Sequence, residues 1–354
     1  MLLDAIDEVL GRRVLCTTLR RGQFAAAVAD RSPDNEVTCF LLDVFLAKQT
    51  LDEIGKERPN VSVHCEADFP EGPFDTVALP FLKNGEAELT RELLQQAHER
   101  LDIGGRLIVS TDNPNDTWIH EQLQLLFDKV TKRPQSRGVL YLALKTHPLR
   151  RVRDFTANFT FRDGKRLVHA ASRPSVFSHR KLDVGARALL EATANARTVK
   201  PGYRILDLGC GSGTVGLALA LRKPGVHVHA MDSNPRALQC TLRGAELNGL
   251  TIVNQPVKTV QGDSLSDGLS DGKSVDGECR SDGRSVETCR FIGRFVASSQ
   301  YIGRRTGMEQ NILDLLARFD GTDARLDSLA VREGRLTSRE VALVLGNGVT
   351  EAVR

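Results

Sequence analysis

The stretch LDLGCGSGTVG, residues 206–216, combines acidic and glycine residues at a spacing that suits ligand binding. Three glycines occupy alternate positions after Asp207, and they are Gly209, Gly211 and Gly213. Glycines let the backbone pass close to a ligand, and a helix that begins near Thr214 offers free N–H groups to a carboxylate. A bound amino acid presents a carboxylate and an ammonium group, and Asp207 is suited to bind the ammonium directly or through water. The stretch therefore predicts a nucleotide-like ligand with an amino-acid end.

Two further acids distinguish between ligands that the glycines alone leave open. Gly211, Gly213 and Gly216 also satisfy the dinucleotide pattern G-x-G-x-x-G, which is typical of NAD sites. Asp232 follows a second apolar stretch, where an acid accepts hydrogen bonds from both ribose hydroxyls. Asp263 follows a third apolar stretch, where a carboxylate is placed for the adenine amino group. An amino-acid end, a ribose and an adenine describe S-adenosylmethionine better than NAD.

Several motifs, taken as a set, resemble a known family. LDLGCGSG, MDSNPRAL, AELNGL and GD are similar to the motifs of class I S-adenosylmethionine-dependent methyltransferases. The upstream stretch PSVFSHRKLDVGARALLEA, residues 174–192, resembles a segment of the bacterial ribosomal RNA guanine-N2 methyltransferases of the RsmC and RlmG type. The resemblance covers residues 1 to about 263 and is strongest from residue 174 onward.

The resemblance implies roles for particular residues. The implied cofactor-binding residues are Asp207, Gly209, Gly211, Gly213, Asp232, Ser233 and Asp263. Phe177, Ser178 and Asp183 are implied to lie near the cofactor and the target pocket, although packing in the core is an alternative for Phe177. The family also has a degenerate methyltransferase-like first domain followed by an active second domain.

The two halves of the chain share one layout. RVLCTTLRRGQFAAAVA (residues 13–29) and RILDLGCGSGTVGLALA (residues 204–220) each read as a strand, a turn and the start of a helix. Both continue to an apolar strand that ends in an acid, Asp43 in the first half and Asp232 in the second. The first glycine loop has become TLRRGQ, with two bulky arginines where a backbone should approach a ligand. We interpret the first half as a duplicate that keeps the fold and has lost the site.

The elements that follow predict the fold class. After residue 43 the first half continues with a strand (74–80), an amphipathic helix (88–101) and a strand (104–113). Alternating strands and helices predict an α/β fold with two tandem Rossmann-like, doubly wound and mainly parallel sheets, the second disrupted after its third strand. The expected divisions are a degenerate methyltransferase-like domain (1–145), a basic inter-domain segment (146–173), a cofactor-binding domain (174–263), a low-complexity disordered segment (264–307) and an atypical C-terminal segment (308–354).

Positive charge is concentrated near the middle of the chain. Residues 129–181 contain fourteen Lys or Arg and two acids, within a chain whose net charge is only +3. This distribution favours a polyanionic partner such as ribosomal RNA or a ribosomal subunit, and a solvated linker face is the alternative. Phe155, Phe159 and Phe161 are interleaved with the basic residues, where aromatic rings can stack on unpaired bases. For Phe159 and Phe161 a half-buried strand is the favoured interpretation.

The family pattern stops after Asp263. A fourth strand ending in Asn-Pro-Pro-aromatic should follow, because that motif holds the exocyclic amine of the target base, and it is absent. Residues 264–287 are rich in Ser, Asp and Gly, which indicates disorder or a flexible RNA-contacting insertion. Asn347 follows an apolar strand, but glycines flank it where prolines belong, so the catalytic residue is unknown. Either a natural variant has lost its catalytic loop or a reading-frame shift has replaced the C-terminal part.

Other classes of site and compartment are disfavoured. The seven cysteines are scattered and include no Cys-x-x-Cys pair, so neither a disulfide framework nor a metal site is predicted. No apolar run approaches the ~20 residues that span a bilayer, and MLLDAIDEVLGRR has acids where a secretion signal would be apolar. The cytoplasm is the expected compartment.

The sequence therefore predicts an S-adenosylmethionine-dependent methyltransferase that acts on the N2 amine of a guanine in ribosomal RNA, with the small subunit favoured. The absence of the Asn-Pro-Pro-aromatic motif leaves open a chain that is inactive. The main alternative is a non-catalytic, RNA-binding methyltransferase-like protein. Methylation of a protein glutamine or a small molecule is disfavoured by the duplicated first half and the basic segment. An NAD-dependent dehydrogenase is disfavoured because no hydride-transfer constellation is recognisable.

Overall fold

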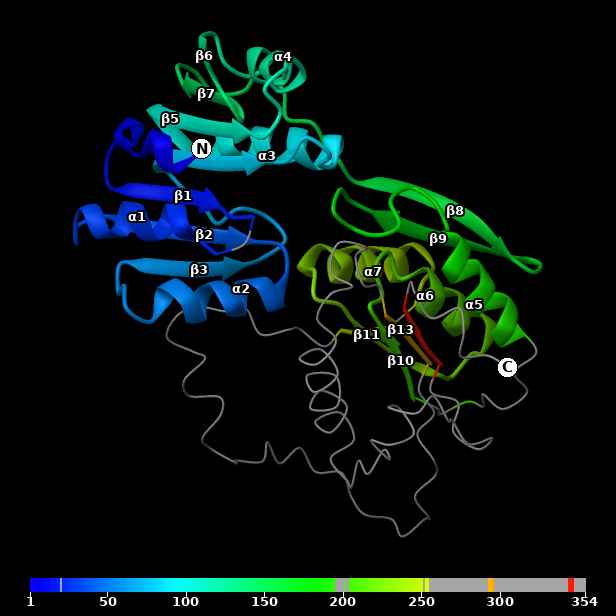
Figure 1. The fold of residues 1–354 in the computed structure, drawn as a ribbon. Coiled ribbons are helices and arrows are strands. Elements are labelled where there is room, and N and C mark those ends of the chain that lie inside the picture. The colour runs from blue at the N-terminus through cyan, green and yellow to red at the C-terminus, as the bar shows by residue number, and fades with distance from the viewer. Residues whose placement is uncertain are drawn as a thin grey trace.

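A seven-stranded, mainly parallel sheet forms the centre of the first half of the chain (Figure 1). The computed structural model describes residues 1–19, 21–194, 201, 204–250, 252–254, 292–295 and 343–346. The strands are β1 (Arg13–Thr17), β2 (Glu36–Leu41), β3 (Val61–Cys65), β4 (Phe74–Phe81), β5 (Leu101–Thr111), β6 (Val130–Gln135) and β7 (Gly138–Leu144). Their order is β3-β2-β1-β4-β5-β7-β6, and only the pairs β5–β7 and β6–β7 are antiparallel.

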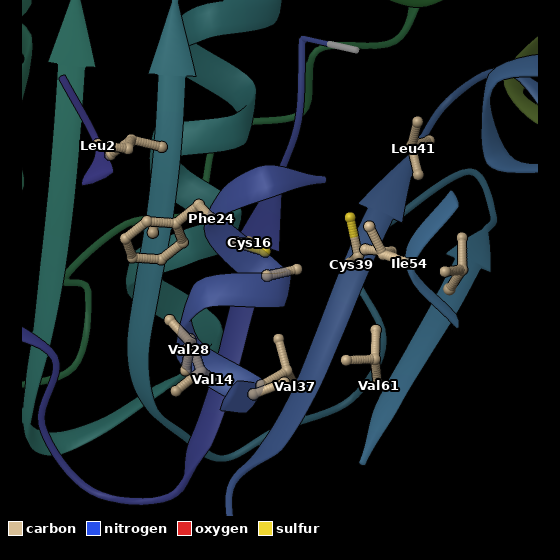
Figure 2. Packing of buried hydrophobic residues seen from close by; sticks show 14 of the residues in the cluster. Leu2, Val14, Cys16, Phe24, Val28, Val37, Cys39, Leu41, Ile54 and Val61 are labelled. Carbon is tan, nitrogen blue, oxygen red and sulfur yellow. The ribbon is translucent and has the colours of Figure 1, made fainter. Parts of the chain in front are cut away.

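Helices cover both faces of this sheet. They are η1 (Leu3–Glu8), α1 (Gln23–Arg31), α2 (Val44–Thr50), η2 (Leu51–Gly55), α3 (Ala87–Arg100) and α4 (Trp118–Gln124). Side chains alternate along a strand, so Val14 and Cys16 pack with α1 on one face while Leu15 packs in the cluster that includes α3 on the other. Figure 2 shows the first of these clusters, in which Phe24 and Val28 of α1 lie over the strands. The near-continuous apolar strands thus reflect burial on two faces.

A three-stranded parallel sheet in the order β10-β11-β12 forms the centre of the second half. Its strands are β10 (Arg204–Leu208), β11 (His227–Met231) and β12 (Val253–Asn254), and its helices are α5 (Val184–Ala194), α6 (Thr214–Arg222) and α7 (Pro235–Leu247). Two further strands, β13 (Ile292–Phe295) and β14 (Leu343–Gly346), pair in parallel with each other. Apart from these two strands, the predicted low-complexity segment (264–307) and the C-terminal segment (308–354) lie outside the described residues.

An antiparallel hairpin connects the two halves and packs on the second. It consists of β8 (Ala157–Asp163) and β9 (Arg166–Ser172), and it lies beside α6 and α7 in Figure 1. Phe161 is buried in the core of the second half together with Val168, and Phe159 packs against that core half-buried. The preference for a half-buried strand over a base-stacking role for these two rings is confirmed.

Buried ion pairs join the two halves. Arg236 on α7 is 0% exposed, its Nε donates to the carbonyl of Ala67 at 2.6 Å, and its Nη1 donates to Glu92 on α3 at 2.8 Å. Arg173 donates to the same Glu92 and to Asp68. Charges this deeply buried require partners, so these contacts fix α7 against α3.

The predicted strand–helix alternation and the mainly parallel sheet are confirmed by this architecture. The helix expected over 88–101 is α3, and the strand expected over 104–113 begins three residues earlier, at Leu101. Within the described part of the chain, no helix is both long enough and apolar enough to cross a membrane.

Candidate functional site

The carboxyl ends of β10 and β11 bring the predicted site residues to one edge of the second sheet. The two strands run parallel, with Leu208 opposite Met231, so the glycine loop after β10 and the acid after β11 become neighbours. The backbone N–H of Gly209 donates to the carbonyl of Met231 at 2.8 Å. Ligands in open parallel sheets bind at this edge.

The glycine loop has a backbone that only glycine tolerates. Gly211 and Gly213 have positive φ angles of 55° and 71°. A Cβ atom on Gly211 would lie 2.0 Å from the carbonyl oxygen of Phe177, and one on Gly213 would lie 2.7 Å from Oγ1 of Thr241. The loop is therefore packed tightly against both the segment before α5 and the helix α7.

Asp232 binds the glycine loop directly. Its Oδ2 accepts from the backbone N–H of Gly211 at 2.8 Å, and its Oδ1 accepts from the N–H of Asn234 at 2.9 Å. Carboxylate oxygens have two acceptor sites each, so hydrogen bonds to a ribose remain compatible with these contacts. The acid predicted for the ribose thus also fixes the loop predicted for the amino-acid end.

Asp207 has a different environment. It is 2% exposed, and its Oδ2 accepts from the N–H of Gly216, in the first turn of α6, at 2.9 Å. The carboxylate therefore ties the end of β10 to the start of α6. A contact of Asp207 with a ligand ammonium stays a prediction.

The segment before α5 lies against the glycine loop, as the Phe177 carbonyl beside Gly211 shows. The Phe177 side chain is 44% exposed, which argues against the core-packing alternative, and Ser178 is buried. Asp183 accepts from the N–H of Ala186 at 3.1 Å in the first turn of α5. The structure thus brings the Phe177 backbone to the loop, and Asp183 accepts a hydrogen bond from its own helix.

Ser233, predicted to bind the cofactor, contacts the first half. Its hydroxyl donates to Oδ2 of Asp43 at 2.8 Å, and its carbonyl accepts from the N–H of Val44 at 3.0 Å. Asp263 and Asn347 lie outside the described residues. Nothing in the sequence signalled the contact between Asp43 and Ser233, because 190 positions separate them.

Electrostatics make Cys210 unsuited to nucleophilic chemistry, although it lies within the loop. Burial raises the pKa of its thiol well above the ordinary value, and the negative charges of Asp232 and Asp207 raise it further. A protonated thiol is a poor nucleophile. Among the described residues, no group of three or more His, Cys, Asp or Glu side chains is arranged to hold a metal ion.

The basic segment divides into paired and unpaired cations. Arg133, Arg173 and Arg180 form ion pairs with acids of the first half. A second group is exposed and has no ion pair with any described residue, and it comprises Arg150, Arg151, Arg162, Lys165 and Arg166. The sequence could not separate the two groups, because pairing depends on acids such as Glu88 that are remote along the chain.

Comparisons with known proteins agree with these observations. The family model of the methyltransferase small domain matches residues 168–273. The chain is 26% identical to the ribosomal RNA small subunit methyltransferase C of Pseudoalteromonas translucida over 76% of this chain and 74% of that protein. It is 31% identical to the Stutzerimonas stutzeri protein of the same name over 51% of this chain and 53% of the relative.

A solved structure supports the fold. The T. thermophilus 16S rRNA N2 methyltransferase RsmC, in complex with AdoMet and guanosine, matches with a TM-score of 0.57 and 20% identity. The match covers 75% of this chain and 70% of that one, and at this identity it shows the fold alone. Family model, relatives and motifs agree in supporting the class I S-adenosylmethionine-dependent methyltransferase family, of the ribosomal RNA methyltransferase type, for this chain.

Proposed function

We propose that this protein is an S-adenosylmethionine-dependent methyltransferase that modifies the N2 amine of a guanine in ribosomal RNA, with the small subunit as the favoured substrate. One observation carries the proposal. The glycine loop and Asp232 are joined by the hydrogen bond from Gly211, so the loop proposed for the amino-acid end and the acid proposed for the ribose are neighbours. The names of the relatives, ribosomal RNA methyltransferases C and G, support the substrate class.

The residues present fit this cofactor. Gly211 and Gly213 lie where an added Cβ would collide with neighbouring atoms, so only glycine lets the loop keep this backbone path beside Asp232. Gly209, Gly211 and Gly213 would hold the methionine end, and Asp232 would hold the ribose. Asp263, proposed for the adenine, lies outside the described residues.

The chain's own contribution to the reaction would be mainly positioning. When bound, S-adenosylmethionine supplies an electrophilic methyl group, which the amine nitrogen takes from sulfur by direct displacement while the amine loses a proton to solvent. Orientation and exclusion of water supply most of the rate in such a step. Phe177 is exposed and its backbone carbonyl lies beside Gly211, so its ring would be available to stack on a base that has left its helix.

The unpaired cations of the basic segment would bind the RNA backbone. Arg162, Lys165 and Arg166 cluster at the end of the β8–β9 hairpin, and all three are exposed. Neutralised phosphates release counterions, so binding through these residues should weaken steeply with salt. The compartment would be the cytoplasm, where ribosomes are assembled.

We further propose that the first half is a degenerate methyltransferase domain. Gly22 and Gly213 both cap a helix in the left-handed conformation, and both pack on a threonine of the next helix, Thr50 and Thr241 respectively. These matched contacts support a duplication. In the first half Thr18 and Arg20 stand at the positions of Gly209 and Gly211.

The alternative function is RNA binding without catalysis. The absence of an Asn-Pro-Pro-aromatic motif favours it, because in the family that motif holds the amine of the target base. Calorimetry with S-adenosylmethionine, followed by tritiated methyl transfer to unmodified ribosomal subunits, separates the two. Binding with transfer, both lost in Asp232→Ala and retained in the exposed control Asp30→Ala, supports the enzyme. Binding without transfer supports the alternative, and absence of binding contradicts the cofactor site.

A further inference from the structure

The turn that carries the ribose-binding acid is attached to the first half of the chain. This turn, Asp232–Asn234, joins β11 to α7. Its central residue, Ser233, makes two hydrogen bonds to the turn after β2: the hydroxyl donates to Oδ2 of Asp43 at 2.8 Å, and the carbonyl accepts from the N–H of Val44 at 3.0 Å. One contact uses a side chain and the other the backbone, so together they fix the position of the turn and its orientation.

Asp43 is itself held rigidly. Its Oδ1 accepts from the N–H of Leu46 at 2.9 Å, which makes it the N-cap of α2. A capping carboxylate is restrained in its rotamer and benefits from the positive end of the helix dipole. Asp43 also follows β2 as Asp232 follows β11, so the first-half counterpart of the ribose acid is bound to Ser233.

Movement of Ser233 would be transmitted to the cofactor site through its two neighbours. Asp232 precedes it and accepts the Gly211 N–H at 2.8 Å. Asn234 follows it, caps α7 by accepting from the N–H of Arg236 at 3.0 Å, and donates to the carbonyl of Ser175 at 3.0 Å. The turn therefore has little freedom except at Ser233, where the first half determines its position.

We propose that Asp43 is a positioning residue for cofactor binding, which acts through Ser233 to hold Asp232 against the glycine loop. The inference rests on the proposed function, because it assumes that Asp232 binds the ribose. The first half would then support the cofactor site in the second half without binding a ligand itself.

The test compares four variants of the full chain: Asp43→Ala, Asp43→Asn, Ser233→Ala and the double variant Asp43→Ala with Ser233→Ala. Asp30→Ala is the matched control, since Asp30 also accepts two hydrogen bonds in the first half, from Arg58. Three quantities are measured: the dissociation constant of S-adenosylmethionine, the melting temperature and the hydrogen-exchange rate of the Gly211 amide.

We expect Asp43→Ala to weaken cofactor binding about tenfold, which corresponds to ~1.4 kcal/mol, and to accelerate exchange at Gly211. Asp43→Asn should restore most of the affinity, because its amide keeps a cap and a partner for the Ser233 hydroxyl. The double variant should bind S-adenosylmethionine no more weakly than Asp43→Ala, because both substitutions break the same hydrogen bond between Ser233 and Asp43.

Affinity and Gly211 exchange in Asp43→Ala that equal those of the wild type would overturn the inference. Equal weakening in Asp30→Ala would also overturn it, because the effect would then be general destabilisation. If the wild type itself bound no S-adenosylmethionine, the proposed function would fail, while the Gly211 exchange rates would still decide whether Asp43 positions the turn.

Discussion

The buried guanidinium of Arg236 offers the sharpest test of how the two halves are held together. Replacement of Arg236 by alanine removes hydrogen bonds to the carbonyls of Ala67 and Pro174 and to the carboxylate of Glu92. Glu92 is itself almost completely buried, so it cannot regain water at low cost. Arg173 still contacts Glu92 in the variant, which limits the loss.

The size of the effect follows from these contacts. Breaking a buried charge pair by removal of one partner costs ~3–5 kcal/mol, and we take the lower end because Arg173 remains. Each kcal/mol lost from the free energy of unfolding lowers the melting temperature by ~2–4 °C in a protein of this size. A loss of ~3 kcal/mol therefore lowers it by roughly 6–12 °C. Differential scanning calorimetry of the wild type and Arg236→Ala measures this shift.

Arg58→Ala is the control, because Arg58 pairs with an exposed acid, Asp30, and exposed pairs contribute ~0–1 kcal/mol. Its melting temperature should stay within about 4 °C of the wild type. A shift in Arg236→Ala as small as that of Arg58→Ala would refute the reasoning that this ion pair is a principal link between the halves.

Three further outcomes are expected. Gly211→Ala should weaken S-adenosylmethionine binding at least about tenfold, or ~1.4 kcal/mol, because the added Cβ collides with the Phe177 carbonyl; calorimetry showing unchanged affinity would contradict this. Phe177→Ala should lower methyl transfer to RNA about tenfold or more, given ~1–3 kcal/mol per stacked base, while the melting temperature of this exposed position stays unchanged. Burial lowers the pKa of His98 to about 4, so the unfolded chain binds more protons between pH 6.5 and 4 and stability should fall as the pH falls through that window. Urea unfolding at pH 7 and pH 4.5 measures this loss of stability. His98→Leu should lose less stability than the wild type over that range, and an equal loss would show that His98 is not the group responsible.

The local architecture of the site could be predicted from sequence because its signals are local. Alternating apolar runs and turns gave β1, β2, β10 and β11, and the acids after β2 and β11 marked the ends of strands. The neighbourhood of the glycine loop and Asp232 follows from parallel pairing alone. Phe177 was expected near this site because of the family resemblance; its backbone carbonyl lies beside Gly211, and its place near a cofactor stays a prediction.

The contacts between the halves could not be predicted in the same way. Arg236 and Glu92 are 144 positions apart, and each reads as an ordinary charged residue on a helix. A half-buried strand was expected at Phe159 and Phe161, but the residues that pack against Phe161 were not, because they belong to a core formed by later parts of the chain. Long-range pairing of this kind leaves no periodic signal in one sequence.

The packing of the hairpin has a practical consequence for dissecting the protein. A fragment that begins at residue 174, where the family segment starts, would lack Phe161, Val168 and Ala170 and leave an apolar surface of α6 and α7 in water. It would also leave Arg222 without Asp163, its buried partner on β8. We therefore expect the second half to fold only together with the hairpin that precedes it, so the unit that folds begins before the segment that resembles the family.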